Sequence, residues 1–462
     1  MFADESRRLV LILALLALPT GAGAQELDRA LAIEREVVRI ASEGELWPGF
    51  APLAIPLAIF TGGRTWLFRH PAPPDGFSPV PGAPGVHAHE NRHPRVTSNT
   101  SAEIGGVVTA TLLADGARAT RSATTLAAVA LHEAFHVHQR ARHPGWIANE
   151  GDAFLYPVAD PALLELRRLE SAALRRAVRA ADSATAACWA RQALDARDRR
   201  FAAMDSAFVA YERLNELNEG LASYVQMRAG GVVDSIPEGG FAADAVRARV
   251  YATGPALGQL LDRLDPGWAG RLARNGGPSP DEVLAQAVGR ASTTACAWPG
   301  DERDRIATQA QADVAALRAS RTERRRAFDG QGGWRIVIRA AAGLPLFPQG
   351  FDPLNVQPID GGLLHTRFLE LGNGDDRVRV IDEGGADLTT LTVGAGAHPL
   401  FNGVREAIVA GLERPRVERD GTRLVLDATG FAATFADAEL EESGQTIVIT
   451  LAPSRRAREN RE

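Results

Sequence analysis

The chain has 462 residues, of which 45% are hydrophobic, and a formal net charge of −6. The length is typical of about three units of roughly 150 residues each, and the composition is that of a chain with hydrophobic cores. The weak negative charge and the lack of a basic arm exclude nucleic acid as a partner. Because the sequence contains Arg but no Lys, mechanisms that need a lysine are excluded as well.

The N-terminus has the pattern of a secretory signal peptide. Arg7 and Arg8 precede an apolar run over residues 9–18, and a small-x-small motif ends at Ala24. The apolar run is too short to span a bilayer. We therefore expect residues 1–24 to be removed on export, which predicts a periplasmic or extracellular location and no membrane span in the mature chain. An uncleaved membrane anchor and a twin-arginine signal are the alternatives.

In an exported protein the cysteines can form a disulfide. Cys188 and Cys296 are the only two in the chain, and an oxidising compartment favours a disulfide between them. In the chain-entropy model such a bond would stabilise the fold by about 4–5 kcal/mol. Two buried free thiols are the alternative.

Up to residue 328 the sequence changes from strand-like to helical patterns. The charges of the helical part are expected to lie on solvated helix faces. In chain order we predict a helix (27–40), a β-hairpin (52–60 and 65–69), a loop rich in Pro and Gly (71–95), a strand or hairpin (100–113), an apolar helix (124–140), a mostly helical region (160–228) and helices at 251–264 and 301–327.

Beyond the Gly-rich segment 329–333 the composition changes again. Short apolar runs alternate with turn residues, which predicts strands at 334–339, 363–371, 377–381, 423–426 and 446–451. The predicted fold class is therefore α+β. It has one domain at 25–328 and a small β-rich domain at 334–462.

The pattern HExxH occurs twice, at 89–93 and at 132–136. It binds zinc only on a helix, where residues i and i+4 lie about 5–6 Å apart and both imidazoles reach one ion. The first copy lies in the predicted Pro/Gly loop and is followed directly by Pro94. We therefore predict a solvated loop there.

The second copy lies within the predicted apolar helix. Uncharged residues flank it and fill its centre, as a dry metal site requires, because an unpaired charge there would be costly. Only His138 departs from the apolar pattern of zinc-binding helices. We predict that His132 and His136 bind Zn²⁺ and that Glu133 is the general base. The alternative is a chance string on a core helix.

A catalytic zinc site needs a third protein ligand and an open position for water. The metzincin class has Gly and His at the third and sixth positions after the motif, where this chain has Gln139 and Arg142, and is excluded. The segment 218–222, Asn-Glu-Gly-Leu-Ala, resembles the NEGxA segment of gluzincin aminopeptidases, whose Glu is the third zinc ligand. This resemblance to the zincin metallopeptidases of the gluzincin type implies that Glu219 has that role.

Glu216 lies on the same predicted helical face as Glu219. It is the alternative third ligand, or a carboxylate that orients a histidine. An exposed acidic stripe formed by Glu212, Glu216 and Glu219 is the structural alternative. The ligands are farther apart in sequence than in compact gluzincins, so the resemblance implies a zincin-like domain with a helical insertion at about 155–205.

The resemblance implies a secreted zinc metallopeptidase, in which Glu133 takes a proton from the zinc-bound water and passes it to the leaving amine. Tyr224 and Tyr251 are candidates for the second donor to the oxyanion, with buried packing tyrosines as the alternative. The strand at 100–113 offers an edge on which a peptide could pair.

The expected partner is a peptide or protein substrate, with no nucleic acid, and the sequence indicates no particular oligomeric state. Two other functions stay open. One is a non-catalytic exported binding protein on the zincin scaffold, against which the intact Glu133 argues. The other is a zinc hydrolase that cleaves non-peptide amides or esters.

Overall fold

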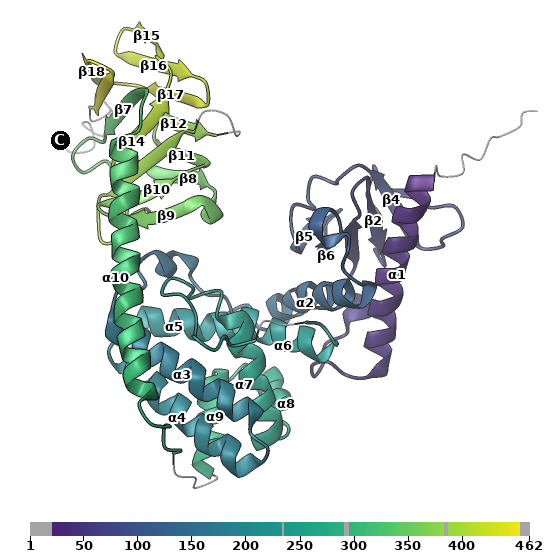
Figure 1. Ribbon diagram of the computed structural model, residues 1–462. Helices are drawn as coiled ribbons and strands as arrows, with labels where there is room; N and C mark the ends of the chain where they lie inside the picture. The colour runs from purple at the N-terminus through teal and green to yellow at the C-terminus, as the bar shows by residue number, and fades with distance from the viewer. Residues whose placement is uncertain (1–20, 233–234, 291–294, 383–386, 453–462) are drawn as a thin grey trace, which may run out of the picture. The chain divides into compact units, whose positions relative to one another are not determined.

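The computed structural model describes residues 21–232, 235–290, 295–382 and 387–452 (Figure 1). The fold is mixed α+β, as predicted, with an N-terminal six-stranded sheet, a helical middle part and a β-rich C-terminal part. Residue contacts divide the chain into two compact units, each built from separate segments. The first unit is made of Met1–Ile147, Leu214–Ser235 and Val250–Ala287, and the second of Ala148–Arg213, Ile236–Arg249 and Val288–Glu462. The domain limits expected from the sequence, with the insertion at about 155–205, stay a prediction.

The first unit combines the N-terminal sheet with five helices and most of a sixth. Its elements are α1 (Gly21–Glu43), η1 (Pro52–Ala54), β1 (Leu57–Phe60), β2 (Arg64–Phe68), β3 (Ser78–Pro79), β4 (Val86–Glu90), β5 (Thr100–Ile104), β6 (Val107–Leu113), η2 (Gly116–Arg118), α2 (Ala123–Arg142), η4 (Glu216–Gly220), α6 (Leu221–Arg228), α7 (Val250–Leu264), α8 (Trp268–Asn275) and most of α9 (Pro280–Arg290).

The sheet of the first unit has the strand order β3-β4-β2-β1-β6-β5. The predicted hairpin forms β1 and β2, which pair antiparallel, while β1 and β6 pair in parallel. A second hairpin joins β5 and β6 through Gly105 and Gly106, whose φ angles are +56° and +79°. A two-residue turn of this type requires positive φ at both positions, which glycine adopts without strain. Strand β5 is one of the two edge strands of the sheet, and β3 is the other.

Helix α2 connects this sheet to the other helices of the first unit. It packs against α1, β6 and α6. Its N-cap is Ser122, whose hydroxyl accepts a hydrogen bond from the backbone N–H of Thr125 at 3.1 Å. The apolar face expected from the sequence is buried, with Leu126, Leu131 and Phe135 at 0–1% exposure. This packing fixes the helix that carries the second HExxH copy.

The second unit combines helices with two sheets. Its elements are η3 (Glu150–Phe154), α3 (Pro161–Arg179), α4 (Ser183–Ala202), most of α5 (Ser206–Asn215), α10 (Glu302–Asp329), η5 (Pro353–Asn355), β7 (Trp334–Arg339), β8 (Phe347–Phe351), β9 (Val356–Ile359), β10 (Gly362–His365), β11 (Phe368–Asn373), β12 (Asp376–Ile381), β13 (Thr389–Gly394), β14 (Val404–Leu412), β15 (Arg416–Asp420), β16 (Arg423–Ala428), β17 (Phe431–Phe435), β18 (Ala438–Ser443) and β19 (Thr446–Leu451).

The strands of the second unit form a seven-stranded sheet, β18-β19-β7-β14-β13-β10-β9, and a six-stranded sheet, β15-β16-β17-β12-β11-β8. The two sheets share one hydrophobic core. Ile338 and Val409 enter it from the first of these sheets, and Leu371 and Phe435 from the second. The β-rich C-terminal part predicted from the sequence is therefore present, with more strands than the predicted runs.

Buried charges join the helices of the second unit. Glu170 on α3 accepts hydrogen bonds at 2.6 Å from Arg197 and Arg200 on α4, and from Arg249. Glu212 on α5 pairs with Arg200 and Arg249. All five side chains are at most 2% exposed. The expectation of solvated helix faces is wrong for these residues, because each carboxylate has several guanidinium partners that offset its loss of hydration.

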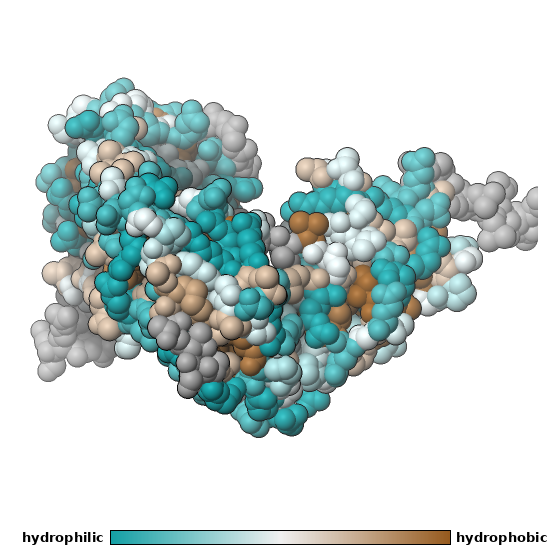
Figure 2. Space-filling model, turned by 60° about the horizontal axis from the view of Figure 1, so that its bottom comes forward, coloured by the Kyte–Doolittle hydropathy of each residue, from teal (hydrophilic) through white to brown (hydrophobic). Residues whose placement is uncertain are grey.

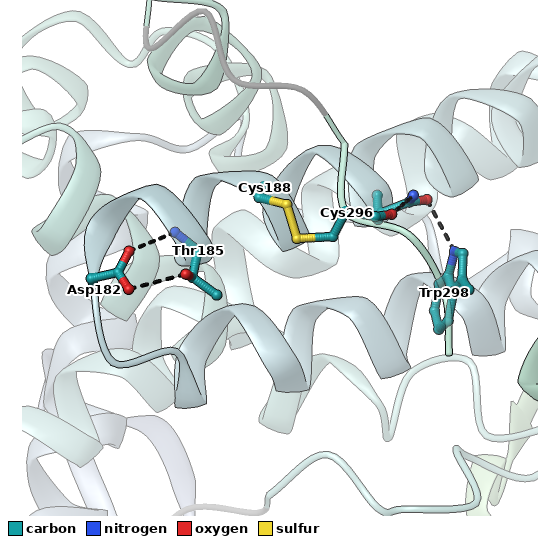
Figure 3. The surroundings of a disulfide bond; sticks show 6 residues. Asp182, Thr185, Cys188, Cys296 and Trp298 are labelled. Carbon is teal, nitrogen blue, oxygen red and sulfur yellow. Dashed lines mark hydrogen bonds between the residues drawn. A yellow bond between two sulfur atoms is a disulfide. The ribbon is translucent and has the colours of Figure 1, made fainter. Parts of the chain in front are cut away.

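Cys188 on α4 and Cys296 form a disulfide, with their Cα atoms 5.1 Å apart (Figure 3). The bond confirms the pairing that the sequence left open. Next to it, the indole N–H of Trp298 donates to Gln192 Oε1 at 3.0 Å. The disulfide is consistent with an oxidising compartment. The predicted signal peptide overlaps residues 1–20, which lie outside the described residues, and α1 begins at Gly21.

Several predicted elements are wrong in detail. The segment 71–95 is not a continuous loop, because it contains β3 and β4. The predicted strand at 363–371 is two strands, β10 and β11, and the helices α8 and α9 were not predicted. In the described part of the chain, no helix is long and apolar enough to cross a membrane. Hydrophilic and neutral residues cover most of the face shown in Figure 2.

We expect reduction of the disulfide to lower the free energy of unfolding by about 4–5 kcal/mol, because the bond closes a loop with a sequence separation of 108 and so restricts the unfolded chain. Urea denaturation followed by circular dichroism measures the loss. The double variant Cys188→Ala/Cys296→Ala should unfold like the reduced protein and should not respond to reductant. Equal urea midpoints for oxidised and reduced wild type would contradict the expectation.

Candidate metal centre

Three buried ligand groups meet in the first unit. The ligand atoms of His132, His136 and Glu219 all lie within 4.8 Å of one another, and this is the one such group of His, Cys, Asp or Glu in the described residues. The two Nε2 atoms are 3.1 Å apart. Glu219 Oε2 lies 3.3 Å from His136 Nε2 and 3.6 Å from His132 Nε2. The three side chains could therefore hold one metal ion.

Two different helical geometries place these ligands. His132 and His136 are one turn apart on the same face of α2, and their rings stand at 80° to each other. Glu219 lies on η4, a single π-helical turn between α5 and α6. Such turns insert an extra residue into a helix and are frequent at functional sites. The π turn gives Glu219 its position toward α2.

The side chain of Gln139 links the metal-binding helix to the π turn. Its Nε2 donates to the carbonyl oxygens of Leu217 and Asn218, at 2.8 and 3.0 Å. The amide nitrogen is thereby assigned as a donor, so Oε1 must accept the hydrogen bond of 2.9 Å from His136 Nδ1. This bond places a proton on Nδ1 of His136, so Nε2, which lies 3.3 Å from Glu219 Oε2, is the atom that would bind a metal.

His132 is held by packing. Its ring stacks on that of Tyr251, with centroids 6.3 Å apart and an interplanar angle of 16°. Its Nδ1 is buried and has no hydrogen-bond partner in the part of the chain that the structure describes. The orientation of this imidazole therefore depends on Tyr251 and on the buried face of α2.

The donor set and its spacing fit a zinc ion. Two imidazole nitrogens and one carboxylate oxygen are the three protein ligands of many catalytic zinc sites. Tetrahedral bonds of ~2.0–2.1 Å would separate the ligand atoms by about 3.3–3.4 Å. The separations of 3.1, 3.3 and 3.6 Å lie around this value. The site is thus preformed without rearrangement of the backbone.

Glu133 follows the first ligand directly and is 8% exposed. Burial raises the pKa of this carboxyl group, although the nearby imidazoles act in the opposite direction. Burial alone would lower the pKa of His136, but the hydrogen bond and charge of Glu219 outweigh it and raise the pKa. A carboxylate with a raised pKa beside a metal site is suited to accepting and returning a proton.

His138, the one departure from an apolar motif, packs as an aromatic residue. Its ring stacks on Phe135 at 5.6 Å and lies 5.4 Å from Phe50. Burial lowers its pKa to about 4. The neutral ring therefore does not place a charge next to the metal centre.

A close backbone contact sets the height of the π turn above α7. A Cβ atom added at Gly254 would lie 2.2 Å from the Cα atom of Gly220. Gly258, one turn later on α7, leaves similar room for the ring of Tyr224. Side chains at these positions would separate the two helices. The position of Glu219 thus depends on two neighbouring glycines that face each other.

The other candidate residues are not members of this group of three ligands. Glu216 is fully buried on the π turn, and Glu212 belongs to the buried charges of the second unit. An exposed acidic stripe is therefore wrong, since all three glutamates are buried. The hydroxyl of Tyr224 donates to both carboxylate oxygens of Asp262, at 2.9 and 2.7 Å. Of the two tyrosines, Tyr251 is the one in contact with a ligand.

The first HExxH copy is not helical. His89 lies on strand β4, and Phe77 packs against both His89 and His93. The solvated loop predicted there is wrong for His89, which is half-buried on a strand. The copy has no third ligand group within reach among the described residues. The helical setting distinguishes the two copies, as expected.

Sequence reasoning missed Gln139 and Gly254. Gln139 served only to exclude the metzincin pattern, although its spacing of three residues from His136 on a helix predicts contact with that ring. No local signal marks Gly254, because its role depends on a contact with a distant segment. No family model, curated protein or solved structure matches this chain.

We expect Gly254→Ala to weaken metal binding, because the added methyl group would displace the π turn that carries Glu219. Overpacking of this kind lowers the free energy of unfolding by about 1–3 kcal/mol. Titration with Zn²⁺ measures the change in metal affinity, and thermal unfolding measures the loss of stability. Gly289→Ala on α9, where an added Cβ meets nothing within 4 Å, is the matched control. Unchanged zinc affinity in Gly254→Ala would argue against this role of the helix contact.

We expect Gln139→Ala to lower zinc affinity by about 10–100-fold, as for other residues that orient a ligating histidine. The variant loses both the acceptor for His136 and the donor to the π turn. Competition with a chelator of known affinity measures the change. Gln309→Ala, an exposed glutamine on α10, is the control, and equal affinities of the two variants would contradict the expectation.

Proposed function

We propose that this chain is a zinc-dependent hydrolase that cleaves peptide bonds. The observation that carries the proposal is the buried group of His132, His136 and Glu219, with Glu133 directly after the first ligand. A set of three protein ligands leaves a fourth position open, which is the arrangement of catalytic zinc sites. A site that only binds zinc has no need of the additional carboxylate.

Bound zinc would supply Lewis-acid chemistry and lower the pKa of a water molecule to about 7. Glu133 would accept the proton of the attacking water and later deliver it to the leaving amine. Its burial keeps competing water away and supports this role. Gln139 holds the His136 ring in the required tautomer, as its hydrogen bonds indicate.

The edge strand β5 supports a peptide as the substrate. It is the last strand of the sheet and packs against α2. The guanidinium of Arg140, one turn after His136, donates to the hydroxyl of Ser101 on this strand. An extended peptide that pairs with β5 would therefore run along the metal-binding helix.

Tyr251 is our candidate for the second donor to the developing oxyanion. Its ring stacks on the ligand His132 and is only partly buried. The hydroxyl of Tyr224 is bonded to Asp262, which lies outside the group of candidate ligands. The signal-like N-terminus together with the disulfide supports action outside the cytoplasm.

We expect purified protein to contain one zinc per chain, measured by atomic emission spectrometry. His136→Ala and Glu219→Gln should lose the metal, because each removes one of three ligands. Glu133→Gln should keep the metal and lose hydrolysis of a peptide library, while Glu418→Gln, an exposed glutamate on β15, should keep both.

Three outcomes separate the candidate functions. Wild type without zinc would overturn the proposal. Zinc without cleavage of any peptide, but with turnover of small amides or esters that Glu133→Gln abolishes, would point to a non-peptide substrate. Zinc without any hydrolysis would point to a binding protein on the same scaffold.

A further inference from the structure

A cavity of about 470 Å³ lies next to the candidate metal centre in the first unit. Sites for small ligands have volumes of roughly 300–1,000 Å³. The walls come mainly from α2 and α6 and from the start of α7. They include Arg121, Thr125, Val129, Ser223, Gln226 and Tyr251.

The cavity continues the two faces that carry the ligands. On α2, Thr125 and Val129 precede Glu133 at steps of four residues, so the three side chains lie on one face. Ser223 follows Glu219 by four residues. Tyr251 lines the cavity and also stacks on His132. The ring of Tyr251 thus joins the cavity wall to the candidate ligand His132.

The far end of this cavity is positively charged. Arg121 is the one charged side chain among the described residues of its wall, and no described carboxylate pairs with it. It precedes the N-terminus of α2, whose first turn has no acidic residue and whose dipole adds positive potential. Arg29 donates to the carbonyl oxygen of Arg121 and brings a further positive charge.

An acidic residue of the neighbouring helix α1 has partners of its own. Glu36 on α1 accepts a hydrogen bond of 2.9 Å from Thr124 and pairs with Arg39 at 3.0 Å. Its charge is therefore balanced locally. The remaining wall is polar but uncharged, or aliphatic, so Arg121 is the group that can discriminate between charged and neutral ligands.

We propose that this cavity binds the part of a peptide substrate that carries a carboxylate, and that Arg121 recognises this group. The inference rests on the proposed function. Arg121 lies two residues before α2 begins, and helix rise makes the stretch of α2 from Ala123 to His132 about 13–14 Å long. An extended peptide covers ~3.3 Å per residue, so the carboxylate would lie about three to five residues from the scissile bond. It is either an acidic side chain or the C-terminus.

Pairs of peptides test the preference and its source. In one arm, a neutral peptide that the enzyme cleaves is made in two forms for each position, one with Glu and one with Gln at that position. In the other arm, a free C-terminus is compared with its amide. We expect one acidic position, or the free C-terminus, to raise kcat/KM about three- to tenfold, and the gain to shrink as the salt concentration rises.

The variants assign the effect to Arg121. Arg121→Gln should remove the preference and Arg121→Glu should reverse it. Arg118→Gln, an exposed arginine in η2 outside the cavity wall, should retain it. Calorimetric binding of the same peptide pairs to zinc-loaded Glu133→Gln gives a second measurement that does not depend on turnover.

The outcomes distinguish this inference from the proposed function. Cleavage of neutral and acidic peptides at equal rates, with equal binding, would overturn the inference and leave the hydrolase intact. Binding of acidic peptides that depends on Arg121, without any cleavage, would support the cavity and overturn the hydrolase. Neither binding nor cleavage would overturn both.

Discussion

The burial of the Glu219 carboxylate against two imidazoles is the constraint on which the site depends. A carboxylate at 7% exposure loses most of its hydration and needs positive charge or hydrogen-bond donors nearby. His132 and His136 provide nitrogen atoms at 3.6 and 3.3 Å. A divalent cation among the three atoms would add positive charge next to this carboxylate, and the spacing of the ligand atoms could hold one.

The rest of the first unit serves to hold this group in place. Helix α2 is fixed by its buried apolar face and brings the two histidines together. Gln139 connects this helix to the carbonyl groups of the π turn, and the contact of Gly220 with Gly254 sets the distance to α7. Movement of any of these three helices would change the ligand spacing. The second unit also buries glutamates, but there arginines neutralise their charge.

Local patterns allowed part of this structure to be predicted. The apolar setting of His132 and His136 predicted a buried metal-binding helix, and the resemblance of a five-residue segment pointed to Glu219. The π turn and the hydrogen bonds of Gln139 depend on contacts between distant segments, which no local pattern contains. The arginines of α4 were predicted as solvated because their spacing is that of a surface helix, and only their carboxylate partners on α3 and α5 explain the burial. Strand pairing beyond neighbouring hairpins was missed for the same reason.

The contact between Gly220 and Gly254 also limits which substitutions the chain can accept during evolution. A Cβ atom would lie 2.2 Å from the Cα atom of Gly220 if added at Gly254, and 3.1 Å from the Cα atom of Gly254 if added at Gly220. Substitutions at the two sites are therefore not independent. Side chains that line the cavity have space to vary, and variation there would alter what is bound. Sequences related to this one should therefore keep paired glycines wherever they keep His132, His136 and Glu219.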